Sequence, residues 1–550
     1  MTVKADITNQ KESVNFNMDF TNFSLLYPDA ESQRAHSVGE ARPDIDMFVL
    51  EELGLLEVFD LKNTRLSDYF TTDPAVMRYR MEAFADMLAN PIISKTLGRL
   101  IPILSDILEL RRLDSDSGDT NSYLSSLTEI ELYISSIEVL HSGFAQARTN
   151  LKSRAFIALA DRIIELAESD YYMELNEKLN ALTARVRDIK SVTIGVNLDA
   201  QLRPSTAGVL SINPEPFRSG DVLEKILRLN FKDDEYTCIA NLVPFGKKQS
   251  DNQKMALSLA FNSAINEVYK SSLHSWKKIV QQYVLDNTDF LLNLMPEIEF
   301  FVKGTEFQQR LLDRGCKLSI PDIAPAGERV FKARRLYNAK VALKVEGEIV
   351  DNDISFDDSA RVYVLTGPNR GGKSVITCAI GQAQAMMQLG MYVPADEARI
   401  SPADAIYTHF TTGADDTIDK GRLGEECARM REIFDKITPL SLVLLDESFS
   451  STGSYEAAYI AAEVLTAFSR VGCRCLFATH LHELASRLDE INARAGADGG
   501  GYIDTLVAGI EGEGKRSFKI YRAKPDGKSY ARDIAEKYGL TYENITKRFN

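Results

Sequence analysis

The residues with the clearest chemical meaning form the stretch Gly367-x4-Gly372-Lys373-Ser374, within "VYVLTGPNRGGKS". Glycines in such a stretch let consecutive backbone N–H groups converge on an anion at the start of a helix. The lysine supplies a positive charge to the β and γ phosphates of a nucleotide, and the serine hydroxyl is a ligand for Mg²⁺. The residues before it have the pattern of a strand and those after it the pattern of a helix. We therefore predict a loop that binds the phosphates of ATP.

Two acids end an apolar strand further along the chain, where "SLVLLDE" closes with Asp446 and Glu447. The carboxyl end of such a strand lies at the sheet edge beside the phosphate loop, so Asp446 is placed to share a Mg²⁺ ion with Ser374. Glu447 is placed to orient or polarise the attacking water. An acid pair taken alone is more often a surface turn, and it is the phosphate loop that favours the catalytic interpretation.

A histidine ends a third strand, in "LFATHLHEL". At the same sheet edge, His480 can hydrogen-bond the γ phosphate. A lone histidine is more often structural, but three strand-end signals in this order favour one shared site. His482 begins the next predicted helix and is expected to be exposed.

The elements that position these residues belong to one pattern, in which short apolar runs alternate with helices. The expected strands are "RVYVLT", "AIYTHF", "SLVLLDE" and "CRCLFATH", and the expected helices follow residue 373 and lie near 424 to 437 and 455 to 469. Buried strands that alternate with helices predict a parallel sheet with crossover helices. We expect an α/β P-loop ATPase domain over residues 336 to 550.

The preceding residues are predicted to be mainly helical over 71 to 335, as a core and lever-like domain, after a small N-terminal segment over 1 to 70. Apolar stripes at helical spacing are formed by Ile103, Leu104, Ile107 and Leu108, by Leu127, Ile130, Ile134 and Ile137, and by Leu175, Leu179, Leu182, Val186 and Ile189. Alternation at Val192, Ile194, Val196 and Leu198 predicts a short β insertion.

Composition narrows the class of protein. The 550 residues are 44% hydrophobic and 26% charged, as in a globular protein of several domains. The chain shows neither a membrane-spanning run nor an apolar signal segment, so a cytoplasmic protein is expected. Its six cysteines form no C-x-x-C pair, and Cys473 and Cys475 are expected to be buried in a strand. A net charge of -15 opposes general adhesion to nucleic acid, and the basic clusters Lys277-Lys278 and Lys332-Arg334-Arg335 are more often solvated surfaces.

The late motifs resemble one family. "TGPNRGGKS", "YVPA", "GADD", "SLVLLDES", "FATHLHEL" and "DGKSYARDIAEKYGL" occur in the order and spacing of the ATPase domain of MutS proteins, the ABC-related ATPases of DNA mismatch repair. The resemblance implies a homodimer with two composite ATP sites whose nucleotide state controls the grip on DNA. It assigns nucleotide binding to Gly367, Pro368, Asn369, Gly371, Gly372, Lys373, Ser374 and Val375, Mg²⁺ to Ser374 and Asp446, and catalysis to Glu447 and His480.

Several departures from the family pattern alter that expectation. The chain has no Phe-x-Glu segment, with which mismatch-reading members wedge a base, and its first residues do not resemble their mismatch-recognition domain. The part between the lever helices is short for a full clamp. The residues after the ATPase match are too few for the nuclease tail of the shorter branch. We therefore expect a divergent member that acts on DNA structure in repair or recombination.

Two departures concern the composite site. Where the family has Gly-Arg-Ser-Thr-Phe, this chain has "GRLGEECARM", in which Glu425 and Glu426 either face the partner's triphosphate or, as we prefer, cap their own helix and point away. Where the family has a glycine-arginine-glycine-threonine loop, the chain has Ser448, Phe449, Ser450, Ser451, Thr452 and Gly453. We expect Ser450, Ser451 and Thr452 to lie at the dimer interface and their hydroxyls to cap the helix near Tyr455.

Two further readings remain open at this point. In one, the same ATPase acts on structured RNA or on ribosomes, as a branch of the family is thought to do. In the other, ATP binding drives dimerisation without hydrolysis, because the composite-site motifs are altered.

Overall fold

The computed structural model describes residues 23–57, 59, 66–117, 123–187, 191–201, 204–213, 288–368, 370–410, 421–511, 515–524, 536 and 538–546. They fall into two compact units. The helical unit comprises the described residues within Lys95–Thr149 and Ala158–Met295, and the sheet unit those within Asn22–Ser94, Asn150–Ile157 and Pro296–Asn550. The helices that the structure describes include no candidate for a membrane span.

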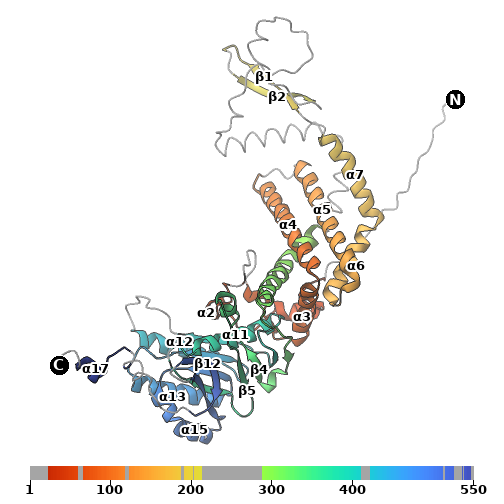
Figure 1. Cartoon of the computed structure of the whole chain (residues 1–550). Helices are drawn as coiled ribbons and strands as arrows, with labels where there is room; N and C mark the ends of the chain where they lie inside the picture. The colour runs from red at the N-terminus through yellow and green to blue at the C-terminus, as the bar shows by residue number, and fades with distance from the viewer. Residues whose placement is uncertain are drawn as a thin grey trace, which may run out of the picture. The chain divides into compact units, whose positions relative to one another are not determined.

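The helical unit (Figure 1) draws on α4 (Pro91–Ser117), α5 (Tyr123–Ala147), η2 (Arg148–Asn150), α6 (Arg154–Ala167) and α7 (Asp170–Arg187). Its core contains most of the predicted stripe residues whose side chains are described: Leu104, Ile107, Ile130, Ile134, Ile137, Leu175 and Leu179. Leu108 was expected in the core but is 45% exposed. The predicted β insertion is confirmed as an antiparallel hairpin of β1 (Ser191–Leu198) and β2 (Pro204–Asn213).

The sheet unit is built on a mixed six-stranded sheet in the order β12-β11-β6-β10-β9-β8 (Figure 1). Its strands are β6 (Val362–Thr366), β8 (Ile406–Phe410), β9 (Leu442–Asp446), β10 (Arg474–Ala478), β11 (Ile503–Glu511) and β12 (Lys515–Arg522). The four strands that the sequence predicted, β6, β8, β9 and β10, are parallel, with β8 at the edge of the sheet, and only β12 runs antiparallel. Because they are parallel, the carboxyl ends of β6, β10 and β9 lie next to one another at a single edge.

The helices of the sheet unit are α11 (Lys373–Gln388), α12 (Arg422–Lys436), α13 (Ser454–Val471), α14 (His482–Ser486), α15 (Leu488–Ala497) and the terminal α17 (Tyr542–Thr546). The predicted helices near 424 to 437 and 455 to 469 correspond to α12 and α13. Cys473 and Cys475 are buried as predicted, and they flank Arg474, which is buried as well. The Arg474 guanidinium donates hydrogen bonds to the carbonyls of Val330, Ser401 and Leu440.

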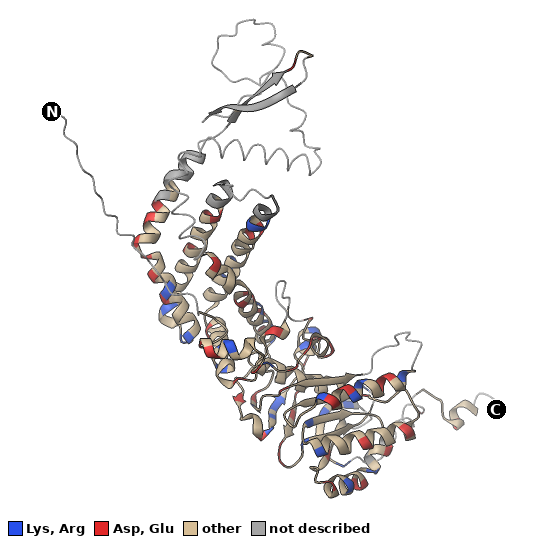
Figure 2. Ribbon diagram, turned by 180° about the vertical axis from the view of Figure 1, so that it is seen from behind, with Lys and Arg blue, Asp and Glu red and all other residues tan. Residues whose placement is uncertain are grey.

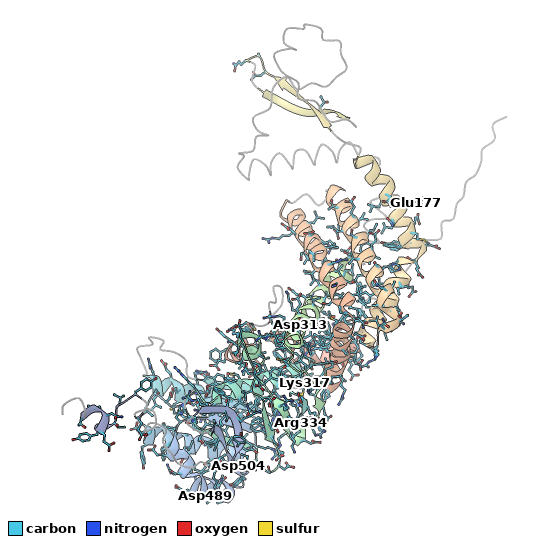
Figure 3. The ribbon with its side chains drawn as sticks, in the orientation of Figure 1. Glu177, Asp313, Lys317, Arg334, Asp489 and Asp504 are labelled. Carbon is cyan, nitrogen blue, oxygen red and sulfur yellow. The ribbon has the colours of Figure 1, made fainter. Side chains whose placement is uncertain are left out.

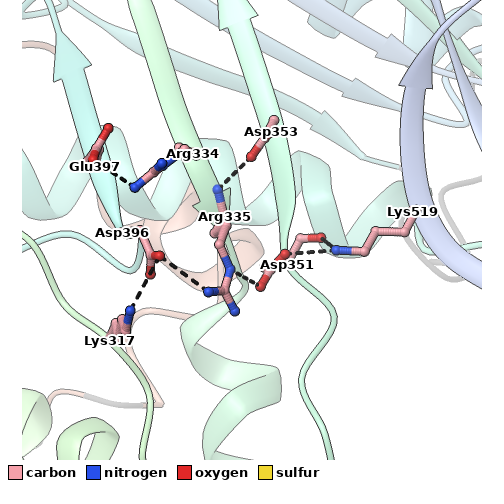
Figure 4. Close-up of polar contacts among 8 residues, drawn as sticks. All are labelled: Lys317, Arg334, Arg335, Asp351, Asp353, Asp396, Glu397 and Lys519. Carbon is pink, nitrogen blue, oxygen red and sulfur yellow. Dashed lines mark hydrogen bonds and ion pairs between the residues drawn. The ribbon is translucent and has the colours of Figure 1, made fainter.

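A second, four-stranded sheet in the order β3-β7-β4-β5 lies in the same unit. It contains β3 (Asp322–Ile323), β4 (Phe331–Leu336), β5 (Asn352–Phe356) and β7 (Glu397–Ile400), with η4 (Ala326–Glu328) and α10 (Ala339–Lys344) beside it in sequence. A polar network connects it to β12 (Figure 4): Arg335 Nε donates to Asp351 at 2.8 Å, and Lys519 Nζ donates to the same carboxylate at 2.8 Å.

The basic cluster predicted near residue 334 is ion-paired. Lys332 lies 2.8 Å from Asp357, Arg334 2.7 Å from Glu397 and Arg335 2.8 Å from Asp351. Ion pairing is not limited to this cluster. Asp504 of β11, which Figure 3 labels together with Arg334 and Asp489, forms an ion pair with Arg522 of β12. In Figure 2 acidic and basic residues are interspersed along the ribbon of the sheet unit instead of being separated by sign. This cluster therefore has the ordinary role of a solvated surface. Lys277 and Lys278 lie outside the described residues.

The described N-terminal residues pack onto the large sheet and its helices. They form α1 (Ala30–Ser37), α2 (Met47–Glu52), η1 (Leu66–Tyr69) and α3 (Pro74–Ala89). The Asp44 N–H donates to the Asp404 carbonyl at 2.7 Å, next to β8, and the Gln382 side chain of α11 donates to the Leu53 carbonyl at 2.8 Å. A Cβ on Gly381 would lie 2.4 Å from the Leu53 side chain, so a glycine is needed for this close approach.

The start of this segment is held by an acid on the helix that spans residues 288–313. Glu297 accepts hydrogen bonds from the Ser24 hydroxyl at 2.9 Å and from the Leu25 N–H at 2.6 Å. The buried Arg80 of α3 donates to the Leu26 carbonyl at 3.1 Å. Residues 24–26 therefore belong structurally with the sheet unit.

Candidate nucleotide-hydrolysis site

The predicted phosphate loop lies between β6 and α11, as its pattern requires. Gly372 is the N-cap of α11 and has φ +94°, and Gly367 has φ +140°, both conformations that L residues with side chains rarely adopt. A Cβ on Gly367 would also lie 2.7 Å from the Ala508 Cβ of β11. Glycine is therefore required at both positions, by backbone conformation at each and by packing at Gly367.

Lys373 points back into the loop that precedes it. The side chain is buried, and Nζ donates to the carbonyls of Gly367 at 3.2 Å and Pro368 at 3.3 Å. Burial lowers the pKa of Lys373, while the nearby carboxylates of Glu447 and Asp446 oppose that shift. A cation held this way is positioned for phosphate oxygens before a ligand arrives.

The three strand-end residues that the sequence predicted come together at this edge. Glu447 Oε1 lies 2.9 Å from His480 Nε2 and 3.8 Å from Lys373 Nζ, and His480 Nε2 lies 3.2 Å from Lys373 Nζ. The register explains the convergence, because Ala478 of β10 is paired with Asp446 of β9 on one side and with Leu365 of β6 on the other. An acid, an imidazole and an ammonium group therefore share one site.

Asp446 and Ser374 form a donor set that suits a divalent cation. The Ser374 hydroxyl donates a hydrogen bond to the Asp446 carboxylate, and burial, the largest influence, raises the pKa of that carboxyl. Asp446 Oδ1 is buried and has no hydrogen-bond partner among the described residues. A hard cation that prefers oxygen ligands would satisfy this oxygen, so the residues present fit Mg²⁺.

The chain turns sharply after β9. Glu447 has φ +56° and Phe449 has φ +65°, although neither is a glycine. The turn is closed by hydrogen bonds from the Glu447 N–H to the Ala478 carbonyl at 2.9 Å and from the Ser450 N–H to the Glu447 carbonyl at 3.3 Å. The Phe449 side chain is fully buried in the core between the sheet and α13. This buried side chain holds the turn in place where the family pattern has a glycine-arginine-glycine-threonine loop.

The residues between the turn and α13 contact side chains of their own chain. The exposed Ser451 hydroxyl donates to Glu426 of α12 at 3.1 Å, and the Thr452 hydroxyl donates to Glu456. The N-cap of α13 is Gly453, without a side-chain hydrogen bond, so the expected hydroxyl cap is wrong. Ser450 is exposed as well.

The two acids of "GRLGEECARM" occupy different surroundings. Glu425 lies in the first turn of α12. The carboxylate of Glu426, the next residue, accepts hydrogen bonds from the Ser451 hydroxyl and from the Phe449 N–H. Our expectation that both cap their own helix is therefore wrong for Glu426, because its hydrogen bonds are to the loop after β9. The two departures from the family pattern contact each other.

Sequence reasoning missed a buried pair beside the turn that follows β9. His409 Nδ1 lies 2.7 Å from Ser448 Oγ, and both side chains are about 1% exposed. His409 comes one residue before the end of β8, so the strand-end reasoning that found Asp446 and His480 also applies to it. Sequence reasoning also missed Phe518 of β12. A Cβ added to Gly372 would lie 3.6 Å from Cδ1 of the Phe518 ring.

The other predicted site residues lie on the first turn of α11, in the phosphate loop or outside the described residues. The Val375 side chain is 42% exposed on the first turn of α11, and its carbonyl accepts a hydrogen bond from Asn338 at 3.0 Å. Gly371 donates to the Pro368 carbonyl at 3.1 Å and shapes the loop. Asn369, the "GADD" stretch and most of "DGKSYARDIAEKYGL" lie outside the described residues, and so does the side chain of His482 at the start of α14.

Comparisons with known proteins agree with this geometry. The family model of MutS domain V matches residues 363–497, which include the phosphate loop, both acids and His480. A second model, the MutS2 N-terminal domain, matches residues 72–314.

Individual relatives carry the same family name. The chain is 32% identical over 228 residues to the DNA mismatch repair protein MutS of Chloroflexus aurantiacus, covering 40% of this chain and 22% of the relative. It is 34% identical over 193 residues to that of Thermosipho melanesiensis, covering 33% and 23%, and 28% identical over 275 residues to that of Streptococcus thermophilus, covering 46% and 31%. The chain thus spans less than a third of the length of each of these relatives. Two family models over consecutive stretches, the named relatives and the converged site lead to one conclusion: the chain belongs to the MutS family.

Proposed function

We propose that this chain is a Mg²⁺-dependent ATPase of the ABC-related P-loop type, which uses ATP hydrolysis in a homodimer to control its grip on DNA during repair or recombination. The observation that carries the proposal is the convergence of Lys373, Glu447 and His480 within 4 Å of one another at the sheet edge. These are the groups that hydrolysis of a nucleotide needs: a phosphate-binding cation, a base or orienting acid, and a hydrogen-bonding imidazole.

Each residue has a distinct task in this proposal. The backbone N–H groups at the start of α11 and the Lys373 ammonium bind the phosphates. Glu447 orients the attacking water and accepts its proton, while His480 holds that carboxylate and reaches the γ phosphate. Mg²⁺, held by Ser374 and Asp446, would neutralise part of the phosphate charge.

The proposed homodimer rests on the family and on the exposed loop after β9. Ser450 and Ser451 are exposed beside the catalytic turn, where a second subunit can reach them. Like the named relatives, which are DNA mismatch repair proteins, the chain is proposed to act on DNA. The absence of a Phe-x-Glu segment from the sequence supports recognition of DNA structure without an aromatic wedge.

ATP turnover tests the enzymatic part. We expect wild-type protein to hydrolyse ATP in the presence of Mg²⁺, and Glu447→Ala to lower kcat by about 10²-fold or more, because it removes the group that activates water. Glu463→Gln is the matched control, since Glu463 is a carboxylate of α13 that pairs with Arg494 away from the site. Equal rates in wild type and Glu447→Ala would remove the catalytic assignment. No turnover in wild type, together with dimerisation on ATP binding, would favour an ATP-gated module without hydrolysis.

A second candidate function is an ATPase that acts on structured RNA or ribosomes. The specific observation in its favour is that residues 72–314 match the MutS2 N-terminal domain, a model named for another branch than the curated relatives. Competition binding at two or more salt concentrations, with mismatched, branched and homoduplex DNA against structured RNA, separates the two candidates. Preference for branched DNA supports the first, and preference for structured RNA supports the second.

A further inference from the structure

The catalytic turn is attached to a neighbouring strand by the His409–Ser448 pair. Ser448 lies between Glu447 and Phe449, both of which have positive φ. Its hydroxyl lies 2.7 Å from His409 Nδ1 and 2.9 Å from the His409 carbonyl, and the His409 ring lies 5.9 Å from the Phe449 ring. The residue directly after the catalytic acid is therefore held by an imidazole at the end of β8.

The hydrogen-bond pattern of His409 defines its tautomer. Nε2 lies 3.0 Å from the carbonyl of Glu426, which only accepts hydrogen bonds, so Nε2 carries the proton. In the neutral ring Nδ1 is then an acceptor, and the single hydroxyl hydrogen of Ser448 is shared between Nδ1 at 2.7 Å and the His409 carbonyl at 2.9 Å. Burial, the largest influence, lowers the pKa of His409 to about 4, which favours this neutral form near pH 7. The imidazole thus connects α12 on one side with the catalytic turn on the other.

The geometry of the turn explains why such an anchor is needed. Residues other than glycine disfavour positive φ, and such a conformation persists only where the surrounding structure holds it. The Ser448 hydrogen bonds and the buried Phe449 ring hold this turn, whereas the Glu447 carboxylate itself contacts only His480 and Lys373 among the ion pairs of the described residues. Release of Ser448 would let the backbone of Glu447 relax, and its carboxylate would move with it.

We propose that His409 and Ser448 are positioning residues for hydrolysis: their hydrogen bond fixes the turn that presents the Glu447 carboxylate to His480 and to the attacking water. The proposal rests on the proposed ATPase function. It predicts an effect on kcat with little effect on nucleotide binding, because neither side chain makes a hydrogen bond to the described part of the phosphate loop.

Two substitutions of the same residue separate positioning from general support. His409→Asn places an amide near the Nδ1 position and can keep the hydrogen bond to Ser448. His409→Gln places its amide near the Nε2 position and keeps only the hydrogen bond to Glu426. We expect His409→Gln and Ser448→Ala each to lower kcat by about 10- to 100-fold, since a displacement of about 1 Å has effects of that order. His409→Asn should stay within about threefold of wild type, which corresponds to less than about 1 kcal/mol.

The controls are chosen to separate folding from positioning. His36→Asn removes another buried imidazole, which contacts the Asp68 carbonyl away from the site, and should leave kcat unchanged. The Kd for a fluorescent non-hydrolysable ATP analogue should stay within about threefold of wild type in every variant. Hydrogen exchange of a peptide over residues 447–453 should be faster in His409→Gln and unchanged in His409→Asn. This hydrogen-exchange measurement does not depend on catalysis.

The possible results have distinct meanings. If wild type and His409→Gln turn over ATP at equal rates and exchange hydrogen equally, the positioning role is wrong while the ATPase assignment stands. If His409→Gln keeps its activity and His409→Asn loses it, the bond to α12 is the important one and the inference is also overturned. If wild type has no turnover, the proposed function fails, and faster exchange over 447–453 in His409→Gln would still support the anchoring of the turn.

Discussion

Phe449 provides a sharp test of the strained turn, because its side chain and its backbone have opposing effects on stability. The ring is fully buried, while the backbone has φ +65°. Phe449→Ala removes the ring and keeps a Cβ in an unfavourable conformation. Phe449→Gly removes the ring as well and also relieves the backbone.

The magnitude follows from these two parts. Loss of a buried phenylalanine ring costs about 3–5 kcal/mol of unfolding free energy in either variant. At positive φ a residue with a Cβ is disfavoured by about 1–2 kcal/mol relative to glycine, while glycine loses about 0.5–1 kcal/mol more backbone entropy on folding. We therefore expect Phe449→Gly to be more stable than Phe449→Ala by about 0.5–1 kcal/mol, the reverse of the usual order inside regular structure.

The measurement is urea-induced unfolding of the full-length protein, followed by circular dichroism, for wild type and both variants. Hydrogen exchange of the peptide that contains β9 locates the effect, because the full chain has two compact units that need not unfold together. Equal stability of the two variants, or a more stable alanine variant, would refute the strained turn as described. A loss under about 1 kcal/mol in both would refute the buried ring.

Three other changes have defined outcomes. Burial, the largest influence, raises the pKa of Glu297 to about 7, above its unfolded value near 4.5, so the stability it contributes is present below pH 4.5 and is lost as the pH rises through 7. Urea unfolding should show that wild type loses up to about 3 kcal/mol more than Glu297→Gln between pH 4.5 and pH 8; parallel profiles would contradict it. Arg474→Met should lower the free energy of unfolding, measured by thermal unfolding, by about 3 kcal/mol or more, because buried carbonyls lose their hydrogen-bond donor. An unchanged Tm would refute this. Gly367→Ala should weaken binding of a fluorescent ATP analogue at least tenfold because its Cβ would collide with Ala508, whereas Gly327→Ala, with open space around it, should not; equal affinities would contradict the steric argument.

Strands β6, β8, β9 and β10 and the position of the candidate site could be predicted from the sequence because their signals are local. Asp446, Glu447 and His480 each follow an apolar run, and parallel strands bring such ends to one edge whatever the rest of the chain does. The phosphate loop is equally local, since its glycines, lysine and serine are adjacent.

Other features depend on contacts between distant residues. The sequence did not indicate where the N-terminal segment packs, because the hydrogen bond from Gln382 to the Leu53 carbonyl joins positions far apart in the chain. The role of Glu426 was mistaken for the same reason: helix-end rules consider only its own helix, while its partner Ser451 lies on another element. His409 carried a strand-end signal, but its partner Ser448 is a common residue with no pattern of its own.

The most direct test of the central claim is the nucleotide that the protein retains after incubation with radiolabelled ATP and Mg²⁺ and rapid gel filtration. With Glu447 positioned as the group that activates water, wild type should carry mainly ADP and Glu447→Ala mainly uncleaved ATP at similar occupancy. Equal ADP fractions in the two proteins would contradict a catalytic role for Glu447 at this sheet edge.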